Sequence, residues 1–433
     1  QGKAAGVDIV SNERPGEVGT INVRGVRSLS ASNTPLYVVD GIPLMSNSGI
    51  ETLNPQDIES IDVLKDASAT AIYGSRGANG VILVTTKSGK EGKMSLNYSG
   101  TVTIENLQDY SEMMNSAEYI DWRRWSYYYL NPSKYPRGDQ PTKENDYEIF
   151  LGATDPTAWK NIEKGWAGGT WDGSRVPNTD WCDMVTQTGV THEHTLSASG
   201  GTDKMKGYAS IGYLDNEGTV KGQSYTRYTT KLSLDLKPTK WFNLGLNVNG
   251  TFSEQQYGSS ASSVGQLIKG MPSNLYAAST SLFPYASPYD EDGNRIEYPG
   301  GDDKVKNVMN EWNNSQNERR MFRAIGSLYV QLNLGEIFSP LKGLRYRFNF
   351  GPDFRSYRNG SFADANSVSR EGTNRASLTN QSDFSWTLDN LIYYDKEIGK
   401  HSLGVTLLQS ATKYRYEESS MAALNIPLAS AKW

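Results

Sequence analysis

FNLGLNVNGTFS, residues 242–253, is the stretch that decides the fold class of this chain. Apolar side chains occupy one parity of it, from Phe242 to Phe252, and asparagines, threonine and serine occupy most of the other. Successive side chains of a β-strand point to opposite faces. The stretch therefore predicts a strand with one apolar face and one wet face.

The same period of two residues recurs along most of the chain and predicts nine strands in all. The clearest further cases are 344–350 and 384–394. Weaker alternation predicts the remaining six strands, at 94–104, 190–198, 208–214, 228–236, 324–334 and 403–411.

The connections between these strands distinguish a soluble sandwich from a membrane barrel. Tight turns are predicted at one end of the strands, at 200–204, 237–240, 335–342 and 396–400. Mostly long loops are predicted at the other end, at 105–189, 215–223, 254–319 and 357–381. This asymmetry is typical of outer-membrane barrels. We therefore predict a mostly β protein containing a transmembrane antiparallel β-barrel, of which about nine strands are present.

The composition of the 433 residues excludes several classes of function. No aliphatic run exceeds Val81–Val84, far below the ~20 residues that a membrane helix needs. The net charge of -5, with both signs mixed, provides no basic field for nucleic acid. A single Cys182 and three histidines leave little for a metal or acid–base site, and no catalytic constellation is present. We predict no enzyme, no cofactor and no metal.

A different pattern precedes the nine strands. Short apolar runs at 36–39 and 81–84 predict strands of a small α/β unit, and Asn54 followed by Pro55 predicts a helix that starts there and leads into 57–59. The run Gly-Lys-Glu-Gly-Lys at 89–93 predicts a turn. We expect two domains, an α/β plug over 1–92 and the barrel part over 93–433.

Residues 64–86, LKDASATAIYGSRGANGVILVTT, and 54–61, NPQDIESI, carry a family resemblance. They resemble the plug domain of TonB-dependent outer-membrane transporters and, within these, the SusC/RagA branch of Bacteroidetes. Shorter matches are NVRG at 22–25, PLYVVDG at 35–41 and GGTDK at 200–204. These motifs are long and follow the family order, so the resemblance is specific.

The resemblance implies a plugged barrel of about 22 strands in the bacterial outer membrane. It implies import of oligosaccharides, or in some members of peptides, together with a SusD-like surface lipoprotein and driven by the TonB complex. Nine strands cannot close such a wall, because an open edge in lipid leaves backbone groups unsatisfied. We expect further wall strands, and the segment that contacts TonB, to lie outside these 433 residues.

The resemblance also suggests which plug residues act in gating. Charged side chains of the plug are expected to pair with the polar inner wall, either as structural contacts or as a latch that is released on transport. The candidates are Arg24, Asp40, Lys65, Asp66 and Arg76.

The first long connection holds six of the ten tryptophans. Aromatic faces stack on sugar rings or anchor a protein partner, although packing of the loop against itself is the simpler interpretation. The candidates for ligand or partner contact are Trp122, Trp125, Trp159, Trp166 and Trp171.

Two weaker motifs have plain explanations. His192 and His194 share one strand face at a spacing that two metal ligands could use, but no third ligand is evident, and a pair at the membrane interface is the preferred interpretation. The acidic run at 289–294 resembles a calcium loop with proline where ligands belong, so we predict a polar hairpin tip.

Two alternatives remain open on the sequence alone. Within the same fold, the cargo could be a peptide or a siderophore-type chelate. In a different class, the chain could be a secreted β-rich protein that binds carbohydrate or acts in adhesion. The predicted lipid contact of the apolar strand faces distinguishes the second alternative from a membrane channel.

Overall fold

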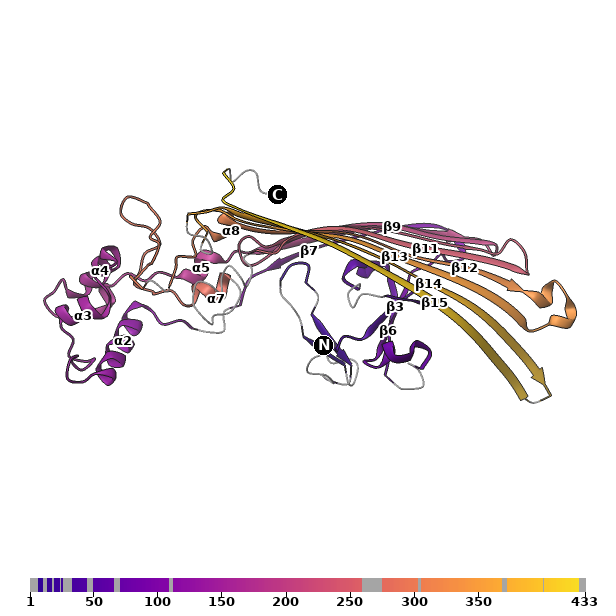
Figure 1. The fold of residues 1–433 in the computed structure, drawn as a ribbon, viewed down its shortest axis with the longest axis horizontal. Helices are drawn as coiled ribbons and strands as arrows, with labels where there is room; N and C mark the ends of the chain where they lie inside the picture. Colours follow the sequence, from indigo (N-terminus) through magenta and orange to yellow (C-terminus); the bar gives the residue numbers. More distant parts are fainter. Residues whose placement is uncertain are drawn as a thin grey trace.

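The computed structural model describes residues 7–10, 14–17, 19–23, 25, 33–44, 50–65, 71–108, 112–258, 275–302, 305–367, 372–399 and 401–427. Its dominant element is a curved sheet of nine antiparallel strands, each bonded to its neighbours in chain order, with β7 and β15 at the open edges (Figure 1). The strands are β7 (Gly92–Glu105), β8 (Gly189–Gly201), β9 (Met205–Glu217), β10 (Ser224–Leu236), β11 (Phe242–Gln256), β12 (Ser315–Asn333), β13 (Leu344–Ala363), β14 (Arg375–Ile398) and β15 (His401–Leu424).

All nine predicted strands are confirmed, but most are longer than predicted. The connection expected at 357–381 shrinks to 364–374, because β13 and β14 continue well beyond the alternating stretches. Residues such as Arg355 and Asn359 belong to these extensions. In the extension of β13 the outward parity mixes Phe354 with Ser356 and Arg358, so it gives no regular alternation for a sequence pattern to detect.

The connections follow the predicted asymmetry. One end of the sheet, here called the turn end, carries short connections with the single turns η6 (Leu334–Glu336) and η7 (Ser339–Leu341). The opposite end, the loop end, carries α2 (Ser116–Leu130), α3 (Lys143–Ile149), α4 (Pro156–Glu163), η4 (Lys164–Trp166), η5 (Gly173–Arg175), α5 (Trp181–Val185), α7 (Leu275–Ser279) and α8 (Glu311–Asn314). Among the described residues, every helix is too short or too polar to cross a membrane.

The N-terminal unit lies against the concave face of the nine-stranded sheet (Figure 1). Its four-stranded sheet has the order β4, β3, β6, β5, in which β3 and β6 are parallel. A separate pair is formed by β1 and β2. The elements are β1 (Val7–Val10), β2 (Thr20–Val23), β3 (Leu36–Val39), β4 (Ile42–Pro43), η1 (Ile50–Thr52), η2 (Pro55–Asp57), β5 (Ile58–Leu64), η3 (Ala71–Gly77) and β6 (Val81–Thr86).

The helix predicted to start at Asn54 is only partly correct. Asn54 caps the element as expected, and its side chain accepts a hydrogen bond from the backbone N–H of Gln56. The helix is a single turn, however, and Ile58 already has extended backbone angles and begins β5. Ladder bonds between β5 and β6 satisfy this backbone, so tertiary pairing overrides the local helix signal.

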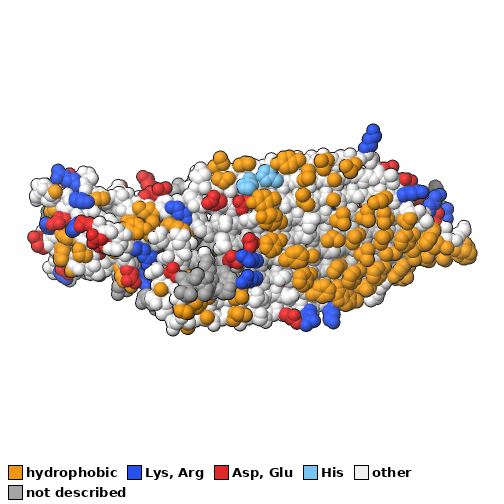
Figure 2. Space-filling model, turned by 90° about the horizontal axis from the view of Figure 1, so that it is seen from above, with side chains coloured by type: hydrophobic (Ala, Val, Ile, Leu, Met, Phe, Trp, Pro, Cys, Tyr) orange, Lys and Arg blue, Asp and Glu red, His pale blue; other side chains and the backbone are white. Residues whose placement is uncertain are grey.

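The two faces of the nine-stranded sheet differ as the alternation predicts. On β11, Val248 and Phe252 are exposed, whereas Asn249, Thr251 and Ser253 are buried on the side of the plug. Apolar side chains form a broad band over the convex face (Figure 2). The polar face therefore encloses the plug, and the apolar face points outward.

Candidate functional site

Polar side chains of the nine-stranded sheet bind the plug through buried hydrogen bonds. Tyr208 and Ser210 of β9 each donate from the hydroxyl to Asp57 Oδ1 at 2.7 Å. Asn54 Nδ2 donates to Thr195 Oγ1 of β8 at 3.0 Å. Because Asp57 and Asn54 are buried, removing these partners would leave polar groups without water. The contacts hold the plug in one position on the wall.

Asp40, one of the predicted gating residues, is the centre of a second buried contact. Its carboxylate accepts hydrogen bonds from the backbone N–H of Thr86 at 2.8 Å and from the Thr86 hydroxyl at 2.6 Å. Lys231 of β10 places Nζ 4.0 Å from Asp40 Oδ2 and also donates to the Thr86 hydroxyl. Lys231 is 2% exposed. The wall thus provides a buried cation for the plug carboxylate.

Of the other four predicted plug charges, the structure describes two, Lys65 and Arg76. Lys65 follows the end of β5 and is partly buried, and Arg76 is exposed at the end of η3. Arg24 and Asp66 lie outside the described residues. A gating role for these four residues stays a prediction.

Replacing Gly212 by a residue with a side chain is expected to weaken the contact between the plug and the wall. A Cβ there would lie 2.4 Å from Thr229 Oγ1 and 2.5 Å from Asn54 Nδ2, at the contact between plug and wall. We expect Gly212→Val to weaken plug seating by about 1–3 kcal/mol. The measurement is the entry of a large antibiotic that the intact outer membrane excludes. Gly250→Val, at an outward-facing glycine of β11, is the control, and an equal leak in both variants would contradict the prediction.

A cavity of about 460 Å³ lies between the plug and the wall. Three tyrosines line it, Tyr37 from the plug and Tyr225 and Tyr357 from the wall, together with serine and amide side chains. Burial, assisted by the charge of Glu51, raises the pKa of Tyr37 to about 12, so its hydroxyl stays protonated. No sequence pattern singled out the two wall tyrosines, because Tyr225 and Tyr357 lie beyond the predicted strands 228–236 and 344–350.

Both arginines that line this cavity are paired with carboxylates, and Glu51 adds an acidic group to the lining. Arg319 Nη1 lies 2.8 Å from Glu17 Oε1, and Arg355 donates from Nε to Asp383 Oδ2 at 2.7 Å. The Arg319 guanidinium also lies 3.5 Å from the ring centre of Tyr257. The cavity therefore offers aromatic faces, hydroxyls and amides beside arginines whose charge is already balanced.

The two long connections at the loop end fold together into one unit, here called the loop module (residues 112–186 and 275–314). Trp181 Nε1 donates to the backbone oxygen of Phe283 at 2.8 Å, and Asn161 Nδ2 donates to that of Tyr285 at 3.1 Å. Burial raises the pKa of Tyr285. The buried core draws on both connections: Ile120, Ile149, Phe150, Ala158, Ile162, Val176, Trp181, Val185, Leu275, Ala278, Leu282, Phe283, Tyr285, Ala286, Val305 and Val308.

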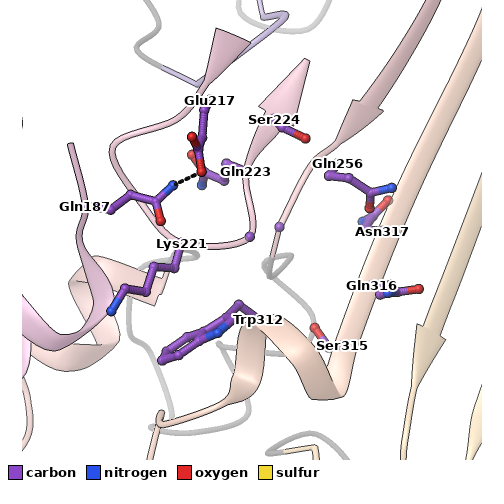
Figure 3. A pocket seen from close by; sticks show the side chains of 12 residues that line it. Gln187, Glu217, Lys221, Gln223, Ser224, Gln256, Trp312, Ser315, Gln316 and Asn317 are labelled. Carbon is purple, nitrogen blue, oxygen red and sulfur yellow. Dashed lines mark hydrogen bonds between the residues drawn. The ribbon is translucent and has the colours of Figure 1, made fainter. Parts of the chain in front are cut away.

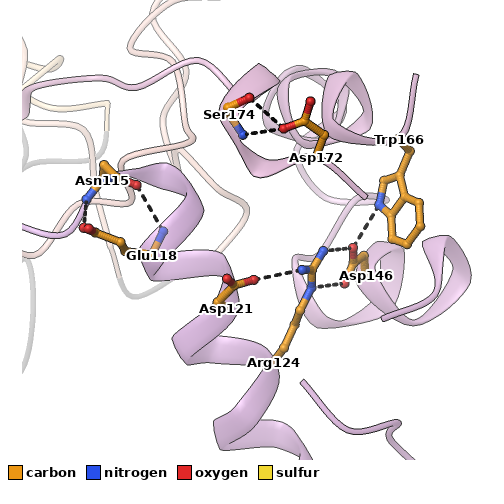
Figure 4. Close-up of polar contacts among 8 residues, drawn as sticks. All are labelled: Asn115, Glu118, Asp121, Arg124, Asp146, Trp166, Asp172 and Ser174. Atoms are coloured by element: carbon orange, nitrogen blue, oxygen red, sulfur yellow. Dashed lines mark hydrogen bonds and ion pairs between the residues drawn. The ribbon is translucent and has the colours of Figure 1, made fainter. Parts of the chain in front are cut away.

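Arg124 of α2 links three parts of the loop module (Figure 4). It donates from Nε and Nη2 to the two carboxylate oxygens of Asp146, at 2.9 and 2.6 Å. Trp166 Nε1 donates to Asp146 Oδ2 at 2.9 Å, and the guanidinium lies 3.9 Å from the ring centre of Trp171. Burial raises the pKa of Asp146, and the hydrogen bonds from Arg124 and Trp166 oppose that shift.

The structure places the five predicted tryptophans in two settings. Trp166 and Trp171 belong to the Arg124 network, and Trp159 packs edge-on against Tyr147 inside the module. Trp122 is 53% exposed on α2, and Trp125, one turn along, stacks on Tyr129. Of the five, Trp122 is thus exposed on the surface of the module, while the other four are half-buried.

The histidine pair lies on the outward face of β8. Tyr98 and His194 approach within 2.8 Å, from the hydroxyl to Nδ1, and His192 Nε2 lies 3.5 Å from Asp215 Oδ2. Throughout the described part of the chain, no three histidine, cysteine or acidic side chains gather as a metal site would require. Each histidine thus has a neighbour on the outward face that accounts for its position.

The acidic run at 289–294 forms a turn closed by an isolated bridge between Tyr289 and Arg295. Asp290 accepts hydrogen bonds from the backbone N–H groups of Asp292 and Asn294, and bonds of this kind lower the pKa of its carboxyl. The carboxylate is thus engaged in shaping the turn, as expected of a polar hairpin tip.

Comparisons with known proteins agree with this architecture. The family described as TonB-dependent Receptor Plug Domain matches residues 1–81. TonB-dependent receptor P26 of Formosa agariphila is 30% identical over 416 residues, which are 93% of this chain and 36% of the relative. TonB-dependent receptor SusC of Bacteroides thetaiotaomicron is 31% identical over 306 residues, which are 66% of this chain and 26% of the relative. The chain thus spans only about a third of the length of such relatives.

Solved structures share the fold over the whole chain. The RagAB peptide transporter matches with a TM-score of 0.77 and 24% identity, covering 100% of this chain and 48% of that one. The ferric citrate transporter FecA matches with a TM-score of 0.53 and 11% identity, covering 96% of this chain and 44% of that one. At these identities the likeness establishes the arrangement of plug and wall.

Proposed function

Because this chain belongs to the SusC/RagA-type family of TonB-dependent receptors, we propose that it supplies the plug and nine wall strands of a channel that imports oligosaccharides across the bacterial outer membrane. The family consists of transporters and not of enzymes. The chemistry proposed here is accordingly binding and release, without a cofactor. The proposed partners are a SusD-like surface lipoprotein and the TonB complex.

The lining of the cavity between plug and wall is the observation that favours an oligosaccharide as the cargo. Tyr37, Tyr225 and Tyr357 offer aromatic faces, and the side-chain amides of Gln255 and Gln381 line the same space. Since Arg319 and Arg355 are each paired with a carboxylate, the cavity suits an uncharged, polyhydroxylated ligand. A peptide is the second candidate, because the RagAB peptide transporter shares the fold.

The buried contacts of the plug support a gating role for Asp40. A pull on the plug from the turn end must separate Asp40 from Lys231 and Asp57 from Tyr208. Several such contacts acting together hold the plug until force is applied. Arg24, Lys65, Asp66 and Arg76 are proposed to contribute to the same latch.

The exposed aromatic face of α2 is the proposed contact surface for the lipoprotein. Exposed Trp122 and half-buried Trp125 supply aromatic contact area at low cost in side-chain entropy. Trp159, Trp166 and Trp171 support this surface from inside the module. The apolar band on the convex face supports residence in the outer membrane, whereas a secreted adhesive protein would expose that band to water (Figure 2).

The test compares ligand binding in the natural receptor and its Tyr357→Ala variant. We expect neutral oligosaccharides to bind the natural receptor and the variant to bind them about tenfold more weakly, because one aromatic face is lost. Tyr213→Ala, on the outward face of β9, is the control and should bind normally. Binding of tripeptides in place of oligosaccharides would refute glycan import and support peptide import.

A further inference from the structure

A second cavity, of about 520 Å³, lies at the loop end, above the rim of the wall (Figure 3). It is formed where the connection between β9 and β10, the end of β11, the helix α8 and the start of β12 meet. None of the functions proposed above uses it. Its lining is Gln187, Glu217, Lys221, Gly222, Gln223, Ser224, Gln256, Gly258, Trp312, Ser315, Gln316 and Asn317.

The lining combines one aromatic ring with many amides. Trp312 is its only aromatic side chain, while four glutamines and one asparagine surround the same space. An amide offers a donor and an acceptor side by side, which matches neighbouring hydroxyls of a sugar. The apolar face of a pyranose ring, in turn, packs on an indole. The one acidic residue, Glu217, and the one basic residue, Lys221, balance each other in charge.

Several contacts hold this lining in place. Lys221 donates to the backbone oxygen of Met184 at 2.8 Å, and its Nζ lies 5.2 Å from the ring centre of Trp312. Gln187 Nε2 donates to Glu217 Oε1 at 3.2 Å (Figure 3). A Cβ at Gly222 would lie 2.8 Å from the Cβ of Trp312, so the backbone packs closely beneath the ring. The polar groups are therefore arranged before any ligand binds.

The strand register places this cavity at the rim of the wall, with lining residues from both faces. Ser315 and Asn317 have the inward parity of Arg319, whereas other residues face outward. Glu217, Ser224 and Gln256 form one row across β9, β10 and β11. Four residues further down the same strands and on the same face lies the aromatic row of Tyr213, Tyr228 and Phe252. Aromatic rows mark the membrane interface in such barrels, and four residues span roughly 13 Å along a strand. The cavity thus lies at the rim of the wall, beyond the aromatic row.

We propose that this rim cavity is a saccharide-binding subsite, separate from the cavity between plug and wall, which holds one uncharged pyranose ring against Trp312. The sugar reaches it either as part of a free oligosaccharide or as the headgroup of a glycolipid in the surrounding membrane. In both cases the recognised chemistry is the same: one apolar ring face and adjacent hydroxyls. The subsite goes beyond the proposed import and can fail independently of it.

The experiment uses the natural receptor in a Tyr357→Ala background, so that the lumen cavity contributes little to binding. The soluble probes are methyl glycosides of glucose, galactose and mannose. The membrane probes are phospholipid vesicles with and without lipopolysaccharide. We expect Trp312→Ala to weaken binding about tenfold, Trp312→Phe to retain most of it, and Gln256→Leu to weaken it without disturbing the ring. Trp241→Ala, at an exposed tryptophan of the turn end, is the control.

Each result decides the proposal. Weaker binding of the soluble glycosides by Trp312→Ala supports the subsite and identifies a free saccharide as the source. If Trp312→Ala loses binding only to vesicles that contain lipopolysaccharide, the subsite is supported and its ligand is a lipid-linked sugar. Equal binding by Trp312→Ala and Trp241→Ala for all probes would overturn it, whatever the outcome for import.

Discussion

Arg124→Met is expected to destabilise the loop module by about 3–5 kcal/mol, because it leaves the buried carboxylate of Asp146 without its cation. Arg124 is 2% exposed and Asp146 is fully buried, so water cannot replace the lost partner. The same change removes the guanidinium from the ring of Trp171. Hydrogen exchange of residues 116–166 in the natural receptor measures the effect, and the nine wall strands serve as the internal reference.

Two further variants separate the ion pair from simple packing. The double variant Arg124→Met with Asp146→Leu should recover most of the lost stability, because no charge stays buried. Arg175→Met, which breaks an exposed pair with Asp172, should have little effect because both side chains are in water. If the double variant is no more stable than Arg124→Met, the proposed cause is wrong.

The loss of stability caused by Arg124→Met should also depend on pH. Without the arginine, burial raises the pKa of Asp146 further above its ordinary value, so the folded variant binds a proton more tightly than the unfolded chain. Its stability relative to the natural receptor therefore increases as pH falls through this raised pKa and decreases as pH rises. Hydrogen exchange at two pH values, corrected for intrinsic exchange rates, checks this sign.

Leu246→Lys is expected to destabilise the barrel wall by about 2–4 kcal/mol, since it places a charge at the lipid midplane. Leu246 lies on the outward face of β11, between Leu234 and Leu328 on the adjacent strands. It is also near the middle of the span from Phe242 to Phe252, which bracket the apolar band. Equilibrium unfolding of the natural receptor in lipid vesicles is the measurement.

Asn247→Lys is the matched control for this prediction. Asn247 is the next residue of β11 and lies on the opposite, polar face beside Ser233 and Ser327. A lysine there faces the lumen side, so we expect a much smaller loss of stability. Equal losses at Leu246 and Asn247 would show that the apolar face of β11 does not contact lipid.

The sequence predicted the parts of the fold that depend on one-dimensional periodicity. Alternation at 242–253 and its counterparts predicted nine strands and an outward apolar face, because strand geometry assigns each parity to one face. The lengths of the predicted connections distinguished the turn end of the sheet from the loop end. The signal failed in the extension of β13 beyond Phe350, since Phe354 and Phe362 share their parity with Ser356 and Arg358 and the alternation is irregular there.

The candidate site was only partly predictable, because its contacts join residues far apart in the chain. Asp40 was a candidate from sequence, but its partner Lys231 is a lysine on the wet face of β10 that no local pattern distinguishes. Likewise, the aromatic richness of the first long connection was visible in the sequence, whereas the contact of Trp166 with the Arg124–Asp146 pair depends on tertiary folding.

The sequence by itself thus determined the strand count, the membrane-facing parity and the family of the plug, since each depends on local order along the chain. Only the tertiary structure decided which polar residues meet: Asp57 with Tyr208 across 151 positions, and Trp312 with the glutamines of the rim. The physical reason is that burial and hydrogen-bond partners are properties of packed surfaces, and strand pairing and loop folding assemble those surfaces from distant segments.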